Sequence, residues 1–313
     1  MAEMIATRDA YGQVLAELGG ENPNIVVLDA DLSKSTKTAE FGKKYPDRFF
    51  DVGIAEANMM GMAAGLSLTG RIPFVSTFAI FGTGRVYDQV RNAICYPHLN
   101  VKLALSHAGI TLGEDGASHQ MLEDIALMRA LPNMTVIVPA DAVEAKKAVR
   151  AVAAMDGPAY LRLGRPAVPV VFDSHYDFQI GKAARLRDGK DVAILACGVM
   201  IAEALDAAAQ LEQEGISALV LNVSTIKPLD EAAVVAAAAQ CGCVVTAEEH
   251  NVIGGLGSAV AEALARKRPT PMRFIGVQDT FGESGKPDEL LEKYGLKGHH
   301  IAAAAKEVIA RKA

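Results

Sequence analysis

Residues 24–30 and 71–78 read NIVVLDA and RIPFVSTF, and they begin the pattern from which the fold class can be inferred. Each is a short run of β-branched, aliphatic and aromatic residues without the polar alternation of a half-exposed strand. Strands that are apolar along their length are buried on both faces, which is typical of a parallel sheet covered by helices. Three more such runs follow: VKLALSH at 101–107, MTVIVPA at 134–140 and AYLRLG at 159–164.

Helical patterns rich in alanine separate these strands, at residues 8–18, 56–68, 83–95 and 141–154. From Pro166 to Asp191 the pattern breaks into proline, charge and short polar pieces, which indicates a linker. The alternation then resumes with strand candidates DVAILACG (191–198), SALVLNVST (217–225), CVVTAEEH (243–250) and MRFIGVQ (272–278), and with helices at 200–214, 229–240 and from Gly257. We therefore expect two α/β domains with open, mostly parallel sheets, residues 1–180 and 181–313, joined across the surface.

Composition excludes several classes of protein. The 313 residues carry a net charge of −6 and no basic run with interleaved aromatics, which argues against a nucleic-acid binder. Every apolar stretch is too short to span a membrane, and the first residues, MAEMIATRDAYGQ, lack the basic start and apolar core of a secretory signal. The four cysteines, Cys95, Cys197, Cys241 and Cys243, show no metal-ligand spacing. We expect reduced, buried thiols in a cytoplasmic protein.

Polar residues follow several of the predicted strands. Because ligands gather beyond the carboxyl ends of parallel strands, the segments after these strands could converge on one edge of the first sheet: 29–35, 76–81, 106–119 and 162–165. The second domain offers only NVIGGLGSA after a strand, which lacks the lysine of a P-loop and the trailing acid of a dinucleotide fingerprint. A tight turn into a helix is the better interpretation of that segment.

The stretch from Asp51 to Gln120 concentrates the candidate functional residues. Its opening segment, DVGIAEANMMGMAAG, contains Glu56 as the one acid after Asp51, and FVSTFAIFG ends an apolar run with Phe78 and Phe81. A glycine-rich loop, SHAGITLGEDGASHQ, then carries two histidines and an aspartate: His107, His119 and Asp115. An isolated acid, flat aromatic faces and titratable loop residues are what activation of a heterocyclic cofactor requires.

Six motifs occur in the order and spacing of one family: ATR at 6–8, ADLSKS at 30–35, GIAE at 53–56, TFAIF at 77–81, GEDGASHQ at 113–120 and PADAVEA at 139–145. On these motifs the chain resembles the transketolases along essentially its whole length, with their pyrimidine-binding domain followed by their C-terminal domain. Transketolases hold the diphosphate and its magnesium through a GDG motif in a separate N-terminal domain, and that motif is missing here. The resemblance therefore implies the C-terminal subunit of a split, thiamine diphosphate-dependent transketolase. Its partner would be an N-terminal subunit that carries the Mg²⁺ ligands, in an α2β2 heterotetramer, so we expect no metal ligand on this chain.

The resemblance also assigns residues to the coenzyme. Glu56 would hydrogen-bond the pyrimidine ring, and apolar neighbours such as Ile54 would strengthen that bond. Phe81 would stack on the same ring and Phe78 would wall the pocket, while Asp31 would support the interface near the coenzyme. From the residues alone, Glu56 could equally be an acid that stabilises the start of a helix, and a pair of phenylalanines is more often core.

For the sugar substrate, the resemblance implies that His107 and His119 contact the donor's oxygens and help to move protons, and that Asp115 selects its hydroxyl configuration. Arg8, Ser35 and Arg165 would bind the phosphate group. Arg162 and Arg165 point to opposite faces of an extended strand, and we prefer Arg165 for the phosphate. The histidines could alternatively bond only to the backbone.

Three kinds of function compete. The first is a transketolase subunit that transfers a two-carbon ketol unit from a ketose phosphate to an aldose phosphate. Two alternatives use the same chemistry: the β subunit of a 2-oxo acid dehydrogenase and a deoxyxylulose-phosphate synthase. Deoxyxylulose-phosphate synthases have GIAE as this chain does, whereas many transketolases have arginine at the position of Ala55. The paired histidines and the phosphate set favour a sugar phosphate. The third function is a non-catalytic scaffold, against which the retained Glu56, His107, Asp115 and His119 argue.

Overall fold

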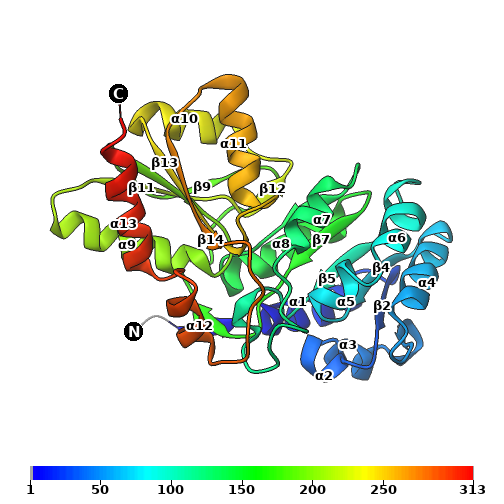
Figure 1. Ribbon diagram of the computed structural model, residues 1–313. Helices are drawn as coiled ribbons and strands as arrows, with labels where there is room; N and C mark the ends of the chain where they lie inside the picture. Colours follow the sequence, from blue (N-terminus) through cyan, green and yellow to red (C-terminus); the bar gives the residue numbers. More distant parts are fainter. Residues whose placement is uncertain (1–2, 313) are drawn as a thin grey trace.

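A computed structural model describes residues 3–312, which form two α/β domains side by side (Figure 1). The larger sheet has seven strands. Its strands, in spatial order, are β12 (Thr225–Lys227), β6 (Thr135–Ile137), β7 (Ala159–Arg162), β5 (Lys102–Leu105), β4 (Ile72–Ser76), β2 (Ile25–Asp29) and β3 (Phe49–Asp51). All neighbours are parallel except β12, which is antiparallel to β6. The parallel sheet predicted from the apolar strands is confirmed.

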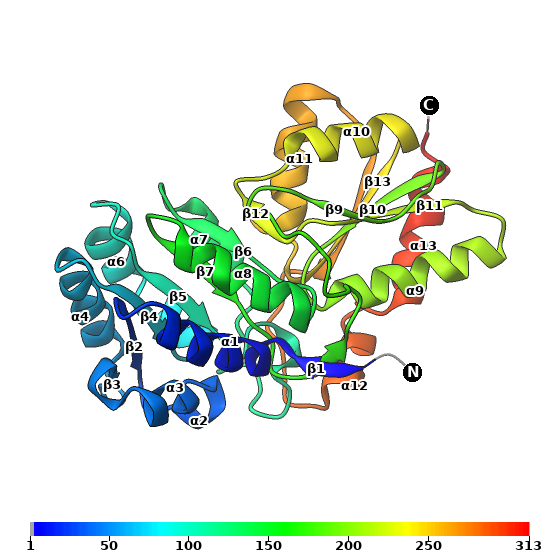
Figure 2. The ribbon, with the colours of Figure 1, turned by 180° about the vertical axis from the view of Figure 1, so that it is seen from behind.

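Helices cover both faces of this sheet. They are α1 (Thr7–Glu21), α2 (Ser33–Thr36), α3 (Ala39–Lys44), α4 (Glu56–Leu68), α5 (Ala79–Thr83), α6 (Tyr87–Gln89), α7 (Asp124–Ala130) and α8 (Ala142–Ala154). On one face α1 and α8 pack against each other (Figure 2). Along β2, Val27 packs into the core under α1 and α8, whereas Val26 and Leu28 pack into the core under α4. Burial of both faces explains why the strand carries no polar alternation.

The second sheet has five strands in the order β14 (Met272–Val277), β13 (Val244–Asn251), β10 (Val192–Ala196), β11 (Ala218–Asn222) and β9 (Ala184–Arg187). It is parallel except for β9, at the edge. Its helices are α9 (Met200–Gln213), α10 (Glu231–Cys241), α11 (Leu256–Lys267), α12 (Pro287–Lys293) and α13 (Gly298–Ile309). α9 and α13 pack together on one face, while α10 and α11 lie on the other (Figure 1).

Three details differ from the sequence-based expectation. The expected helix at 83–95 is divided into α6 and a π-helical segment, Val90–Cys95. The expected linker contains two short strands, β8 (Ala167–Pro169), which pairs with β1 (Met4–Ala6), and β9. One-turn 3₁₀ segments at Pro46–Arg48 and Ile110–Leu112 and the last two helices, α12 and α13, were not anticipated. The one-turn segments carry too few residues for a readable period. This reason does not apply to α13, which has 12 residues.

The two domains are not independent along the sequence. β12 belongs to the second half of the chain, yet it completes the edge of the first sheet by pairing with β6. One hydrophobic core also runs from Met60 and Val75 in the first domain to Leu219 and Val234 in the second. A boundary near residue 180 therefore divides the sequence but leaves a shared interior.

The part of the chain that the structure describes contains no helix both long and apolar enough to cross a membrane. All four cysteines are buried and free, as the reduced-thiol expectation requires. NVIGGLGSA forms the turn into α11, and the carboxylate of Glu248 accepts hydrogen bonds from the N–H groups of Leu256 (2.7 Å) and Gly257 (2.8 Å). That helix start is thus already occupied by an anionic side chain, which agrees with its interpretation as a structural turn.

Candidate functional site

Four aromatic and imidazole rings meet beyond the carboxyl ends of β4 and β5. Phe78 stacks on His107 with ring centroids 3.8 Å apart, and on Phe81 at 6.0 Å. His119 lies edge-on to Phe81 at 5.4 Å. A parallel bridge between Phe78 and Ser106 extends the strand pair and places the two segments side by side. The structure thus brings together four residues that lie up to 41 positions apart, at the sheet edge where they were expected.

The environment of His107 defines its tautomer. Nη1 of Arg8 lies 3.1 Å from Nε2, and the hydroxyl of Ser106 lies 2.8 Å from Nδ1. A guanidinium only donates, so Nε2 must accept, and the proton of the neutral ring resides on Nδ1, which donates to Ser106. The backbone at His107 is left-handed, with φ 60°, and this conformation turns the side chain toward Phe78 and Arg8.

His107 is neutral at pH 7. Burial lowers the pKa of its imidazole to about 3, and the positive charges of Arg8, Arg165 and Lys37 add to this effect. The ring is 3% exposed. The expectation of a histidine that titrates near neutral pH does not describe His107, which instead presents an uncharged ring.

This low pKa has a consequence for stability. The folded pKa lies below the unfolded value of about 6.5, so on acidification the unfolded chain takes up a proton that the folded chain does not. Because of His107, the free energy of unfolding should therefore fall by about 1.4 kcal/mol for each unit by which the pH drops between roughly 6.5 and 3. Urea unfolding of wild type and His107→Gln at pH 7, 6 and 5 tests this. Both proteins contain the same buried carboxyl groups, so the difference between their unfolding free energies reports on His107 alone. Parallel stability curves would contradict it.

Glu56 is the first residue of α4 and is 4% exposed. Both of its carboxylate oxygens accept hydrogen bonds from Nη1 of Arg85, at 3.0 and 3.1 Å. The guanidinium of Arg85 also lies over the ring of Phe81, 4.2 Å from its centroid. Arg85 therefore links the acid to the aromatic rings, and the contacts form a continuous line from Arg8 to Glu56.

Sequence reasoning missed Arg85. Nothing in the local sequence pairs it with an acid 29 positions earlier, although its spacing of four from Phe81 could have indicated a cation over an aromatic ring. The expected apolar surroundings of Glu56 are only partly present. Met59 and Met60 are fully buried, whereas Ile54 is 77% exposed.

Cations gather at the other end of the line. Arg8 donates to the carbonyl oxygen of Ser35 (2.9 Å) and contacts His107, while Arg165 donates to the carbonyl of Leu112 and to Glu114, both at 2.5 Å. Burial lowers the pKa of Arg8, and the nearby charge of Arg165 contributes. Lys37, which also has a left-handed backbone, adds a third positive charge that the sequence analysis did not identify.

The two arginines of β7 and its loop differ in burial and in the contacts that they make. Arg162 is buried and donates to Asp124 through Nε (2.7 Å) and to the carbonyl of Glu249 (2.8 Å), so its guanidinium is fully engaged. Arg165 is 37% exposed and faces the loop that carries His119. Only Arg165 is available to a ligand from outside.

Some expected site residues stand apart. Asp115 is exposed, and among the described residues no side-chain contact joins it to the ring cluster. Asp31 is likewise exposed, with its N–H donating to Asp51 (3.1 Å). For these two residues and for Ile54, as for the other site residues, the roles implied by the resemblance stay predictions.

The second domain holds the loop that carries His107 and His119. The carboxylate of Glu249 accepts a hydrogen bond from the N–H of Thr111 (2.6 Å), and a Cβ at Gly109 would meet that carboxyl carbon at 2.2 Å. Farther along, the amide of Gln120 donates to the carbonyl of Glu283 (2.9 Å). The geometry of the ring cluster therefore depends on both domains.

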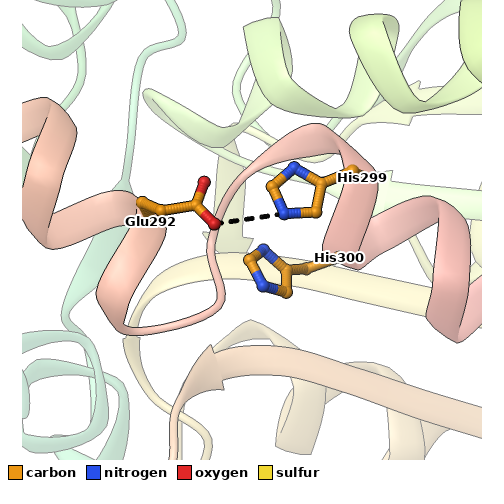
Figure 3. A group of neighbouring side chains, drawn as sticks. All are labelled: Glu292, His299 and His300. Atoms are coloured by element: carbon orange, nitrogen blue, oxygen red, sulfur yellow. Dashed lines mark ion pairs between the residues drawn. The ribbon is translucent and has the colours of Figure 1, made fainter.

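Within residues 3–312, the only group of three side chains with atoms placed to hold a metal ion is Glu292, His299 and His300, between α12 and α13 (Figure 3). This group lies outside the line of contacts from Arg8 to Glu56.

Comparisons with known proteins match the chain on both domains. Residues 3–170 match the family model described as transketolase, pyrimidine binding domain, and residues 181–301 match transketolase, C-terminal domain. The chain is 50% identical to a transketolase C-terminal section of Methanocaldococcus jannaschii, covering 94% of this chain and 93% of that protein. It is 49% identical to a 6-deoxy-6-sulfo-D-fructose transketolase subunit of a Clostridium species, over 97% of this chain and 95% of that subunit.

Longer relatives match over part of their length. Human transketolase is 40% identical over 99% of this chain but 50% of its own length. A solved structure described as a split gene transketolase, inactive beta4 tetramer, is 56% identical and superposes with a TM-score of 0.93, covering 99% of this chain and 100% of that one.

Proposed function

This chain belongs to the transketolase family, and we propose that it is the C-terminal subunit of a split transketolase that acts only with a partner polypeptide. The reaction would move a two-carbon ketol unit from a ketose phosphate to an aldose phosphate. The proposal rests on how much of each relative's length this chain matches. The chain matches a separate C-terminal section almost end to end and human transketolase over half of that protein.

Thiamine diphosphate is the coenzyme of the proposal, and when bound it supplies a carbon that becomes nucleophilic on losing a proton. The residues present suit its pyrimidine ring. Phe78 and Phe81 offer nearly parallel faces at an interplanar angle of 12°. The carboxylate of Glu56 accepts a hydrogen bond from Arg85, whose guanidinium lies over the ring of Phe81. Glu56 would hold the pyrimidine and influence its protonation, while Phe81 would support its face. The diphosphate and Mg²⁺ would be held by the partner subunit.

The cation cluster favours a substrate with an anionic tail. Arg8, Lys37 and Arg165 are close enough to His107 for all three to lower its pKa. A phosphate or sulfonate would be attracted to such a site, whereas a short 2-oxo acid has no group that reaches beyond its reacting carbon atoms. This argues against the 2-oxo acid dehydrogenase alternative. The retained ring cluster argues against a scaffold without activity.

One exposed helix face supports association with another subunit. α4 is apolar around its circumference, yet Ala57, Gly61, Met62 and Leu68 are exposed. A Cβ built at Gly61 would meet no atom within 4 Å. Helices of this composition are normally buried, so the face would be covered in an α2β2 assembly. α4 lies at the outer edge of the first domain in Figure 1. The cytoplasm is the proposed location, consistent with four free thiols.

Reconstitution tests the proposal. The chain mixed with its N-terminal partner, Mg²⁺ and thiamine diphosphate should convert xylulose 5-phosphate plus ribose 5-phosphate, and the chain alone should show no turnover. A parallel assay with 6-deoxy-6-sulfo-D-fructose as donor separates phosphate from sulfonate specificity. Robust activity without a partner would contradict the split-subunit proposal. Decarboxylation of a 2-oxo acid without turnover of any ketose would favour the dehydrogenase alternative.

Arg85 should compete with the coenzyme for Glu56. Because both carboxylate oxygens accept from Arg85, the pyrimidine must share the acid with Arg85 or displace it. Its side chain is 50% exposed, and pairs of this kind contribute up to about 1 kcal/mol. Arg85→Met should therefore tighten thiamine diphosphate binding to the assembled enzyme by up to about fivefold. Calorimetric titration measures this, with the exposed Arg91→Met as the matched control. Weaker binding in Arg85→Met would show that Arg85 is itself a ligand of the coenzyme.

A further inference from the structure

Three potential metal ligands meet at the turn between the last two helices. Glu292 lies in the last turn of α12, and His299 and His300 lie in the first turn of α13. Figure 3 shows the three side chains converging across this turn. One ligand atom from each lies within 4.8 Å of the others. The proposed transketolase chemistry uses none of them.

The spacing of these atoms suits a small divalent cation. Nε2 of His299 is 3.3 Å from Oε1 of Glu292, and the centroids of the two imidazole rings are 4.0 Å apart. Zinc binds imidazole nitrogen and carboxylate oxygen at about 2.0–2.2 Å, so its tetrahedral ligand atoms are roughly 3.4 Å apart. The pair of Glu292 and His299 already has this separation, and small side-chain rotations would bring in His300.

A second observation points to a ligand at this place. Nδ1 of His300 is buried, and it has no hydrogen-bond partner within the described residues. Buried polar atoms are normally paired. The contact of 3.3 Å between His299 and Glu292 accounts for those two residues but leaves this nitrogen unsatisfied. A cation bound through Nδ1 would satisfy it.

The two helices provide a rigid support. Leu290 of α12 and Ile301 of α13 are buried in the core of the second domain, which positions the backbone on both sides of the turn. The side chains of Glu292 and His299 are about half exposed, at 56% and 53%, so they are free to adjust around an ion. A fixed backbone with adjustable ligands favours binding without refolding.

The surroundings are negatively charged. A hollow of about 300 Å³ beside His299 is lined by Glu203, Asp206 and Glu292 against one lysine, Lys297. The ammonium of Lys297 lies 3.3 Å from Glu203. The carboxylate of Glu203 also accepts a hydrogen bond from the N–H of Gly298 (2.7 Å), which offsets the partial positive charge at the start of α13. The hollow therefore attracts a cation.

We propose that Glu292, His299 and His300 form a binding site for a divalent transition-metal ion of the zinc class. Two imidazoles and one carboxylate suit Zn²⁺, whereas Mg²⁺ prefers oxygen ligands alone. Three protein ligands leave a fourth position for water or for a group from another molecule. The ion would tie the end of α12 to the start of α13. This site is separate from the Mg²⁺ expected on the partner subunit.

Titration of the untagged full chain with ZnCl₂ at pH 7.5 tests the site. Wild type should bind a single ion, and His299→Ala should weaken the binding by roughly tenfold or more, since even outer-shell partners of metal ligands contribute that much. His300→Ala should have a similar effect. The exposed His175→Ala is the matched control and should bind as wild type does. MgCl₂ should give no comparable binding.

Thermal unfolding supplies an independent readout. Without metal, His299→Ala should unfold at the wild-type temperature, because its side chain is largely exposed. Zn²⁺ should raise the unfolding temperature of wild type and not that of the variant. If wild type binds no Zn²⁺, or if His299→Ala and His300→Ala bind it as tightly as wild type, the site does not exist.

Discussion

Replacing Glu56 with glutamine should slow exchange of the thiazolium proton of thiamine diphosphate in the assembled enzyme by about 10²–10⁴-fold. The amide has the size and shape of the carboxyl group, but it cannot give up or take a proton. Glu56 is 4% exposed at the start of α4, so water cannot readily replace it. The line of contacts through Arg85 and Phe81 places this acid beside the proposed pyrimidine pocket.

Proton–deuterium exchange, followed by rapid quenching and NMR, measures this rate. Glu40→Gln is the matched control, because Glu40 is an exposed acid in the first turn of another helix, α3. It should exchange at the wild-type rate. Circular dichroism and partner binding should be unchanged in Glu56→Gln, which separates lost chemistry from lost assembly. Wild-type exchange in Glu56→Gln would remove Glu56 from the mechanism.

Asp124→Ala should lower the free energy of unfolding by about 3–5 kcal/mol. Asp124 is fully buried, and it accepts hydrogen bonds from Nε of Arg162 (2.7 Å) and from the hydroxyl of Tyr160 (2.5 Å). Burial by itself would raise the pKa of Asp124, but Arg162, His250 and the hydrogen bond from Tyr160 together lower it. Removing the aspartate leaves the charge of Arg162 buried with a poorer partner, Glu249, at 3.5 Å.

Urea unfolding measures the loss. Glu262→Ala is the control, because Glu262 is the 54% exposed partner of Arg129 in an ion pair of 2.5 Å, and its loss should cost less than about 1 kcal/mol. The double variant Asp124→Leu/Arg162→Met should recover much of the stability, since apolar side chains can replace a buried pair. Equal costs for Asp124→Ala and Glu262→Ala would show that the buried pair is not a principal source of stability.

Much of the fold could be predicted from the order of residues. Runs such as 71–78 and 101–107 are mostly apolar and lack regular polar alternation, and burial on both faces of a parallel sheet is the physical reason. Helix α8 could be located from its alanine-rich pattern, and in the structure the carboxylate of Asp141 caps it by accepting a hydrogen bond from the N–H of Glu144 (2.9 Å). β12 could not be assigned to the first sheet, because three residues carry no information about a partner strand some ninety positions away.

The candidate site, too, could be predicted from the sequence only in part. Its residues could be named because their motifs resemble those of the transketolases, and the position of these motifs after parallel strands indicated that they would gather at one edge of the sheet. The preference for Arg165 over Arg162 could be inferred from the alternation of side chains along a strand. These inferences are local: each needs only the spacing of a few residues and the geometry of one element.

The protonation state of His107 and the pairing of Glu56 with Arg85 could be learned only from the folded chain. Desolvation depends on how many segments, distant in the sequence, pack around a group. The strength of an ion pair depends on the distance between its charges, which cannot be inferred when tens of residues separate them in the sequence. His107 is neutral because it is buried, with its ring stacked on Phe78, and because three cations lie near it; none of these four residues adjoins it in the sequence. The sequence alone determined which side chains lie at the edge of the sheet. Tertiary packing determined that His107 is neutral there and that Glu56 is paired with Arg85.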